Sequence, residues 1–367
     1  MTECGPEDLA QGDGSADAAT AAKFAKHYHR LTEGRREWLS VHLAPDAVTP
    51  FGARLLEALA AIDARLSGAG SRFVEELADI RYVPTQDDPA AWRAGFEQLV
   101  QKLGEILVAR TLFEAAWPDD TRFALEPTNP VTGAKPEILI DTPAHQWLFE
   151  VKCPAFIDYQ DRRDANGRQL PVRGPLGDVP GMRVGTTLPR DNVLKDFLES
   201  AERKFRDFSN RPRTGLLVVL WDGYIFEVTS ALSHSEAGLL TNKSWHRRNG
   251  VRVTFDSVEG VIVLNHLEVI KVAAQEKWEA RQDDPFRIET AGQPPNVWCP
   301  NVGRDALNPD LARLFNAHPL DELKLAADYA PNDFVMWIDP AAAAREHRRA
   351  QRKRRLLSGT SSLTALR

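Results

Sequence analysis

Apolar residues recur at helical spacing through most of the first third of the chain. Residues 19–77 show this spacing, most clearly in FGARLLEALAAIDARL from Phe51 to Leu66. A second stretch, from about Ala90 to Ala116, places its large apolar residues about 3.6 positions apart, and Pro118 follows it. The pattern predicts an N-terminal helical region and then one long amphipathic helix.

After Pro118 the pattern changes to short apolar runs with turn residues between them. Strands are predicted at TRFALEP (121–127), EILID (137–141) and QWLFEVK (146–152), and a helix at 191–208. The apolar run that begins at Gly215 predicts a central strand, and Asp222-Gly223 predicts a hairpin turn whose second arm reaches residue 228. Residues 260–270 predict a further strand. This order indicates an α/β (α+β) fold, with a central mixed β-sheet flanked by helices.

The same patterns divide the chain into five segments. We expect a disordered acidic N-terminus (1–18), a helical N-terminal region (19–85), a core (86–274), an irregular C-terminal extension with one or two short helices (275–343) and a basic tail (344–367).

Composition excludes several classes of protein. Hydrophobic residues make up 43% of the chain and charged residues 27%, which is ordinary for a globular protein. No apolar run approaches the roughly 20 residues that cross a bilayer, and the first residues lack the apolar segment of a secretory signal. The cysteines, Cys4, Cys153 and Cys299, have neither disulfide-framework nor zinc-site spacing. We therefore expect a soluble cytoplasmic protein that does not enter a membrane.

Basic residues gather in two places although the net charge is −6. Residues 344–357 carry seven Lys or Arg and one Glu, so this segment contributes +6 and the rest of the chain −12 (−6 minus +6). Residues 156–190 hold six Arg and form a predicted long loop. Both segments are candidates for binding nucleic-acid phosphates, through Arg162, Arg163, Arg168, Arg173, Arg352, Lys353, Arg354 and Arg355. The alternatives are a solvated basic tail and a loop whose Arg and Asp side chains pair with each other.

The two strands on either side of residues 142–145 bring charged side chains together. A hairpin there pairs Asp141 with Gln146, Leu139 with Leu148, and Glu137 with Glu150. One face then holds the apolar side chains of Ile138, Ile140, Trp147, Phe149 and Val151. The other face holds Glu137, Leu139, Leu148, Glu150 and Lys152.

Two carboxylates that face each other across a strand pair repel, because their Cβ atoms are only about 4.5–5.5 Å apart. A hard divalent cation such as Mg²⁺ or Mn²⁺ would offset that repulsion. Lys152 points to the same side and could hold a phosphate oxygen or help to polarise a metal-bound water. Such a group suits phosphodiester hydrolysis. The alternative is a solvent-facing cluster in which Lys152 only screens Glu150. The Lys and Arg residues of the helix at 191–208, among them Lys195, Arg203 and Lys204, are interpreted as its solvated face.

Pro136-Glu137, a gap of twelve residues and then Glu150-Val151-Lys152 resembles the motif of the PD-(D/E)XK nuclease superfamily, which has the restriction-endonuclease-like fold. The αβββαβ core of that superfamily is similar to the predicted order of elements from about residue 90 to 221, roughly a third of the chain. The motif differs in having Glu at its first acidic position, where Asp is commoner.

This resemblance implies a Mg²⁺-dependent (or Mn²⁺-dependent) endonuclease in restriction, defence or mobile-element biology. Its implied substrate is DNA, which most members of the superfamily cut, and an RNA-directed enzyme is the alternative. It implies Glu137, Glu150 and the Val151 carbonyl as metal ligands, Lys152 as the residue that positions the attacking water, and Glu105 as an additional acidic residue from the first helix. Asp141 and Glu97 are the alternatives to Glu137 and Glu105. A homodimer would suit symmetric cleavage of both strands. The alternative function is a catalytically inactive nuclease-fold module that binds nucleic acid or a protein partner.

Overall fold

The computed structural model describes residues 14–35, 37–44, 47–82, 89–165, 168–169, 186–187, 190–221, 225–275, 284–288, 295–304 and 307–323. The basic tail and the first thirteen residues lie outside these ranges, so the disorder expected for residues 1–18 is untested there. Residues 14–18 already belong to the first helix, although the sequence pattern indicated a helix only from residue 19.

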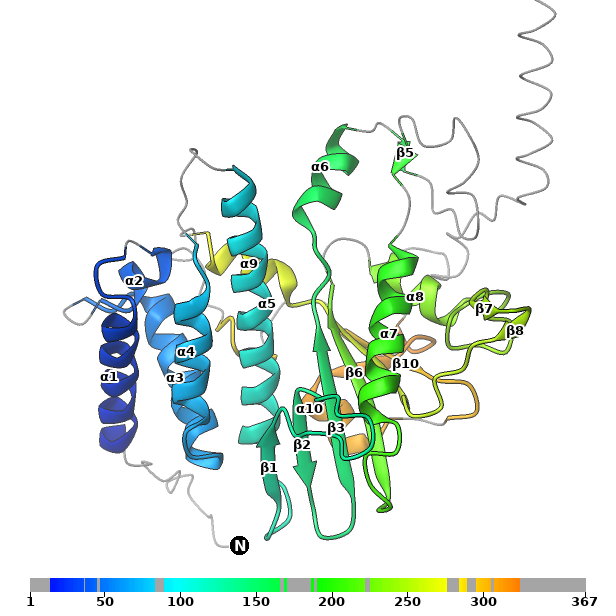
Figure 1. Cartoon of the computed structure of the whole chain (residues 1–367), viewed down its shortest axis with the longest axis horizontal. Helices are drawn as coiled ribbons and strands as arrows, with labels where there is room; N and C mark the ends of the chain where they lie inside the picture. Colours follow the sequence, from blue (N-terminus) through cyan, green and yellow to red (C-terminus); the bar gives the residue numbers. More distant parts are fainter. Residues whose placement is uncertain are drawn as a thin grey trace, which may run out of the picture.

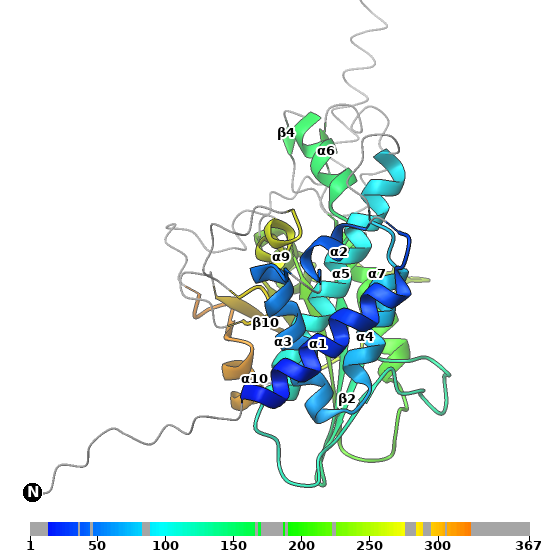
Figure 2. The ribbon, with the colours of Figure 1, turned by 90° about the vertical axis from the view of Figure 1, so that its left-hand side faces the viewer.

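The N-terminal helical region is confirmed. Its helices are α1 (Gly14–Leu31), α2 (Trp38–His42), α3 (Pro50–Arg65) and α4 (Ala69–Asp79). Helix α3 begins where Thr49 accepts a hydrogen bond from the Gly52 amide at 3.2 Å, and Pro50 supplies a backbone already suited to the first turn. These helices lie together at the left of the molecule in Figure 1, and Figure 2 shows them from that side.

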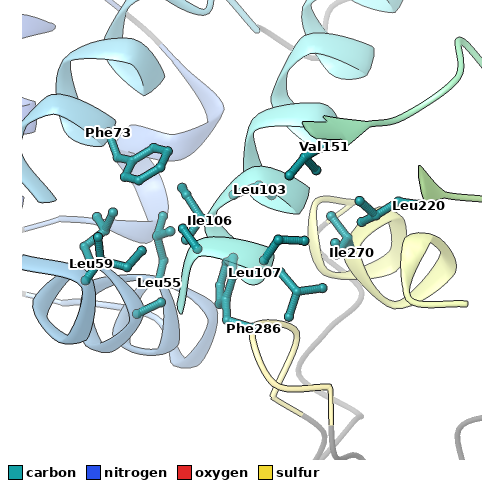
Figure 3. Packing of buried hydrophobic residues seen from close by; sticks show 14 of the residues in the cluster. Leu55, Leu59, Phe73, Leu103, Ile106, Leu107, Val151, Leu220, Ile270 and Phe286 are labelled. Carbon is teal, nitrogen blue, oxygen red and sulfur yellow. The ribbon is translucent and has the colours of Figure 1, made fainter. Parts of the chain in front are cut away.

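Helix α5 (Pro89–Glu114) joins this helical region to the rest of the molecule. Its Leu103, Ile106 and Leu107 are completely buried between Leu55, Leu59 and Phe73 of the N-terminal helices on one side and Val151, Leu220 and Ile270 on the other (Figure 3). Val108 and Leu112 are also fully buried. The helix is therefore apolar almost all round, as expected for a helix between two layers.

A seven-stranded mixed sheet forms the centre of the molecule (Figure 1). Its strands are β1 (Arg122–Leu125), β2 (Ile138–Asp141), β3 (Gln146–Lys152), β6 (Arg213–Leu220), β9 (Gly260–Leu264), β10 (Asn296–Pro300) and β11 (Ala317–Pro319), in that spatial order. The pairs β3–β6, β6–β9 and β10–β11 are parallel, whereas β1–β2, β2–β3 and β9–β10 are antiparallel.

The predicted register of the β2–β3 hairpin is confirmed, with Asp141 opposite Gln146 and Leu139 opposite Leu148. Alternate side chains enter two separate cores. Ile138, Ile140, Phe149 and Val151 pack towards α5 and the N-terminal helices. Leu139 and Leu148 pack on the opposite face against α7 (Asp191–Phe205), which crosses the sheet there.

Helices replace strands at two places where the sequence pattern predicted extended structure. The second arm of the hairpin expected after Asp222-Gly223 is instead α8 (Ile225–Ser233), and the strand predicted to reach residue 270 ends at Leu264 and is followed by α9 (Leu267–Ala273). Helix α8 buries Val228, Ala231 and Leu232, which have helical spacing. Such short apolar runs fit a helix and a strand about equally well, so their tertiary contacts decide the outcome.

The long loop predicted at 156–190 also contains regular structure. Residues Ile157–Ala165 form helix α6, and the short strands β4 (Arg168–Gln169) and β5 (Thr186–Thr187) pair in parallel. The other small ribbon is made of β7 (Arg247–Arg248) and β8 (Val251–Arg252).

The region after residue 274 is not an irregular extension over the residues described. Strand β10 pairs with β9, and β11 pairs with β10, so both belong to the central sheet. Between them lies α10 (Pro309–Leu314), which Asn308 caps through the amides of Asp310 and Leu311. The boundary expected at residue 274 therefore falls within the sheet. Among the helices described, none is both long enough and apolar enough to cross a membrane.

Candidate active site

Strands β2 and β3 separate at the end of β3 that carries the predicted motif. Their ladder ends at the pair Ile138–Phe149, so Glu150, Val151 and Lys152 continue beyond it while remaining paired with β6. Glu137 directly precedes β2, and its carbonyl still accepts a hydrogen bond from the Glu126 amide at 2.9 Å. The two strands thus bring Glu137, Glu150 and Lys152 to one place, as the hairpin register predicted.

Two ammonium groups join the two carboxylates. Lys152 Nζ lies 2.6 Å from Glu150 Oε1 and 3.9 Å from Glu137 Oε1. Lys204 Nζ lies 2.6 and 2.8 Å from the two oxygens of Glu150 and 3.2 Å from Glu137 Oε1. The group therefore holds two negative and two positive side chains in mutual contact.

Glu150 is the most enclosed member of this group. None of its side chain is exposed, whereas Glu137 exposes 20%. Burial raises the pKa of the Glu150 carboxyl; Lys152 and Lys204 lower it, Glu137 raises it, and the resulting pKa is above the ordinary value. The interpretation of the motif as a solvent-facing Glu/Lys cluster is therefore wrong.

Lys204 is a site residue that the sequence interpretation missed. It was assigned to the solvated face of its helix, but α7 directs it between the sheet's carboxylates. Burial acts to lower the pKa of the Lys204 ammonium, but the carboxylates of Glu150 and Glu137 outweigh that effect and raise it. A signal was present in the sequence, because Lys204 follows Phe197 by seven residues and Ala201 by three, at the edge of the apolar stripe.

Asn129 fixes the end of α7 against the loop that precedes β2. Its side chain is completely buried, and its Nδ2 donates to the carbonyls of Lys204 at 2.9 Å and Arg206 at 2.8 Å. Its Oδ1 accepts from the amides of Val131 and Thr132 at 2.8 and 3.0 Å. A single amide thus ties the backbone of Lys204 to the loop that leads to Glu137.

Glu105 lies on the α5 side of the same region. It lines a small cavity of about 20 Å³ together with Glu137, Lys102 and Glu76, a volume on the scale of one water molecule. The Lys102 ammonium contacts the carboxylates of Glu105 and of Glu76, the latter at 2.7 Å. Burial raises the pKa of Glu105, Lys102 lowers it and Glu137 raises it, with a net increase. Glu105 is thus electrostatically linked to Glu137, while its direct ion pair is with Lys102.

The alternative acidic residues occupy structural positions. Asp141 lies at the other end of β2 from Glu137 and pairs with Arg211, which also donates to the Thr142 carbonyl at 2.6 Å. Glu97 accepts hydrogen bonds from the amides of Phe156 and Ile157 at 2.7 and 2.8 Å, and so fixes the start of α6. This geometry supports the choice of Glu137 over Asp141 and of Glu105 over Glu97.

Of the predicted phosphate-binding side chains, only that of Arg162 lies in the described part of the structure. Arg162 is exposed on α6, where its Nε donates to the Asp158 carbonyl at 3.1 Å. Arg163 and Arg168 belong to α6 and β4, but their side chains lie outside the described part of the structure. Arg173, Arg352, Lys353, Arg354 and Arg355 lie outside it entirely.

The donor set fits a magnesium-type cation better than a metal that needs several protein ligands. In the described ranges, no three His, Cys, Asp or Glu side chains cluster as they would around a metal ion. Mg²⁺, however, commonly binds through one or two carboxylates and takes its other ligands from water and from substrate phosphates. Glu137 and Glu150 supply such a pair. The carbonyl of Val151 lies in β3 between Glu150 and Lys152, beyond the end of the ladder with β2.

Comparison with known proteins assigns no family to this chain, because no family model, no curated protein sequence and no solved structure matches it.

Proposed function

We propose that this protein is a metal-dependent endonuclease that hydrolyses phosphodiester bonds in DNA. The observation that carries the proposal is the meeting of Glu137, Glu150 and Lys152 where β2 and β3 separate. Two acidic side chains and a lysine held in this way can neutralise a phosphate and direct a nucleophile to it.

The order of elements supports a restriction-endonuclease-like core. Helix α5 is followed by the antiparallel strands β1, β2 and β3, and then, after an insertion that holds α6, β4 and β5, by α7 and the parallel strand β6. Without that insertion the order is αβββαβ. The motif Pro136-Glu137 precedes β2, and Glu150-Val151-Lys152 ends β3. Glu105 comes from the first helix of that order.

Each site residue has a role that follows from its surroundings. Glu137 and Glu150, with the Val151 carbonyl, would hold Mg²⁺ or Mn²⁺. The cation supplies positive charge against the phosphate and makes water a stronger nucleophile. Lys152 keeps its ammonium beside Glu150 and orients the attacking water or a phosphate oxygen. Glu105 adds negative charge on the α5 side of Glu137.

A second function is favoured by the contacts of Lys204. Because Lys152 and Lys204 already neutralise both carboxylates, the charges of the group balance without a metal ion. That balance suits a catalytically inactive nuclease-fold module that binds nucleic acid or a protein partner. The two functions differ in whether a divalent cation binds at Glu137 and Glu150.

A nuclease assay tests the proposal. The purified full chain is incubated with plasmid and with single-stranded DNA in Mg²⁺, in Mn²⁺ and in EDTA. We expect metal-dependent cleavage that falls at least about 100-fold in Lys152→Ala and in Glu150→Gln, because loss of a group that positions or activates water typically costs about that much.

Lys195→Ala is the matched control, since the Lys195 ammonium pairs with Asp196 at 2.7 Å on the same helix as Lys204 and takes no part in the site. Its activity should equal that of the wild type, and circular dichroism should show all the variants folded. Retained DNA binding without cleavage in any metal would favour the inactive module. Cleavage that persists in both site variants would mean that the reaction occurs elsewhere.

A further inference from the structure

The backbone of Lys204 is fixed independently of its ammonium. Asn129 bonds its carbonyl, and the adjacent Phe205 packs so closely on β6 that a Cβ added to Gly215 would lie 2.4 Å from the Phe205 ring. The last turn of α7 therefore has a fixed place on the sheet. The four-carbon stem of a lysine remains flexible, so its ammonium can move while the helix stays where it is.

The Lys204 ammonium occupies the space between the two carboxylates. It lies within 3.2 Å of one oxygen of Glu137 and of both oxygens of Glu150. Lys152 is placed differently, since its ammonium contacts Glu150 at 2.6 Å but lies 3.9 Å from Glu137. Of these two lysines, Lys204 is therefore the one that bridges the acidic pair.

A divalent cation shared by the same carboxylates competes with this ammonium. Mg²⁺ binds carboxylate oxygens at about 2.0–2.1 Å, so it needs the oxygens and the space that the Lys204 ammonium fills. Both cations also balance the same two negative charges. Binding of one therefore requires the other to leave.

We propose that Lys204 is a built-in counter-cation, which neutralises Glu137 and Glu150 in the metal-free protein and is displaced when a divalent cation binds. This inference rests on the proposed function, because it takes Glu137 and Glu150 as the metal-binding pair. Lys204 then sets the affinity of the site for metal. It also allows the protein to fold before metal binds. Without such a cation, Glu137 would repel a carboxylate that is completely buried.

Calorimetric titration of the full chain with Mn²⁺ alone tests the competition. Lys204→Met keeps the length of the side chain and removes its charge, and Lys195→Met makes the same change elsewhere on α7. We expect Lys204→Met to bind Mn²⁺ about tenfold more tightly than the wild type, which corresponds to about 1.4 kcal/mol. Lys195→Met should match the wild type, and Glu150→Gln should lose the site.

A second measurement uses the wild type alone, in case Lys204→Met does not fold. Reductive methylation followed by mass spectrometry reports how accessible each lysine ammonium is. Saturating Mg²⁺ should raise the labelling rate of Lys204 several-fold, because its ammonium leaves the carboxylates, while the labelling of Lys195 stays constant.

The outcomes separate this inference from the proposed function. In one outcome, the wild type binds metal and cuts DNA, Lys204→Met binds Mn²⁺ no more tightly than the wild type, and Mg²⁺ leaves the labelling rate of Lys204 unchanged. The counter-cation role is then overturned and the nuclease proposal stands. If neither wild type nor Lys204→Met binds Mn²⁺ or Mg²⁺ and no DNA is cut, both are overturned. Tighter binding in Lys204→Met together with metal-dependent labelling of Lys204 supports the inference.

Discussion

At the scale of single residues, the ionisation of the buried Glu150 carboxyl depends on the charged side chains around it. A buried carboxylate is costly unless charged partners or hydrogen bonds replace the water it loses. Here Lys152 and Lys204 both contact it at 2.6 Å, and each lowers a carboxyl pKa that burial and Glu137 raise. The charge of Glu150 is thus set by three neighbours: Lys152 from β3, Lys204 from α7, and Glu137 from the position before β2.

His42 is a second buried group whose charge is controlled by its surroundings. Its ring lies 4.1 Å from the ring of Trp38 and 5.1 Å from that of Phe51, measured between centroids. Its Nδ1 lies 2.7 Å from the Thr49 hydroxyl. Burial among these groups lowers the pKa of His42 from 6.5 to about 4.

This shift predicts a pH dependence of stability. Between pH 6.5 and about 4 the unfolded chain binds a proton at His42 and the folded chain does not, so His42 destabilises the fold as the pH falls through this range. The full effect is about 3–4 kcal/mol, at about 1.4 kcal/mol for each unit of pKa. It should appear as a loss in the free energy of unfolding, measured in urea at pH 7 and at pH 4.5.

His42→Gln is the comparison, because glutamine keeps a polar group near Thr49 and does not titrate in this range. Acidic residues affect both proteins alike, so the informative quantity is the difference between the two pH profiles. The variant should lose less stability on acidification than the wild type, and parallel profiles would contradict the assigned cause.

At the scale of elements, the placement of α7 on the sheet decides whether the charged groups meet. Leu194, Leu198, Ala201 and Phe205 of α7 pack on the sheet face that also holds Leu148 and Leu217. The apolar contacts fix the rotation of the helix and thereby bring Lys204 to the edge of the buried face. Asn129 then fixes the end of the helix along the sheet.

Replacement of Asn129 tests this connection. Asn129→Ala removes four hydrogen bonds: two that link the loop before β2 to the end of α7, and two that Asn129 accepts from Val131 and Thr132 within that loop. We expect the free energy of unfolding to fall by about 3 kcal/mol, since each buried polar group left without a partner costs about 1–3 kcal/mol. Urea denaturation measures this loss.

Asn129→Asp is the matched variant, because it retains the oxygen that accepts from Val131 and Thr132 but loses both donors to α7. Hydrogen exchange should then increase in the last turn of α7 in both variants. An exchange pattern identical to that of the wild type would mean that Asn129 does not hold the helix end.

At the scale of the whole molecule, the central sheet includes strands that lie beyond residue 274, where the predicted core ended. Strand β10 covers the edge of β9, whose five residues are all buried, and β11 in turn pairs with β10. Trp298 of β10 and Phe315, which follows α10, are among the largest fully buried side chains. The last strands therefore belong to the same folding unit as the candidate site.

Truncation tests whether β10 and β11 are required for the rest of the sheet to fold. A chain that ends at residue 275 leaves the apolar strand β9 as an open edge, and such edges promote aggregation. We expect it to be insoluble or to lack a cooperative thermal transition, whereas a chain that ends at residue 323 keeps every strand of the sheet. A soluble, cooperatively melting 1–275 chain would show that β10 and β11 are dispensable for folding.

The sequence alone determined the local features of this protein. Strand side chains alternate, and the loop at 142–145 is short, so the register from Asp141–Gln146 to Ile138–Phe149 followed from the chain itself. The predicted Glu137–Glu150 pair lies one step beyond the end of this ladder, where the strands separate. Apolar spacing reflects the face that each element buries. It therefore also predicted the N-terminal helices, the long helix α5, the strands β1 to β3 and the helix α7.

Only the tertiary structure decided the remaining features, because they depend on contacts between residues far apart in the chain. Lys204 and Glu150 are fifty-four positions apart, and they meet because α7 packs across β3. Asn129 bonds backbone atoms more than seventy positions away. The helices α8 and α9 and the added strands β10 and β11 follow from packing on neighbours, since apolar runs this short fit more than one backbone conformation.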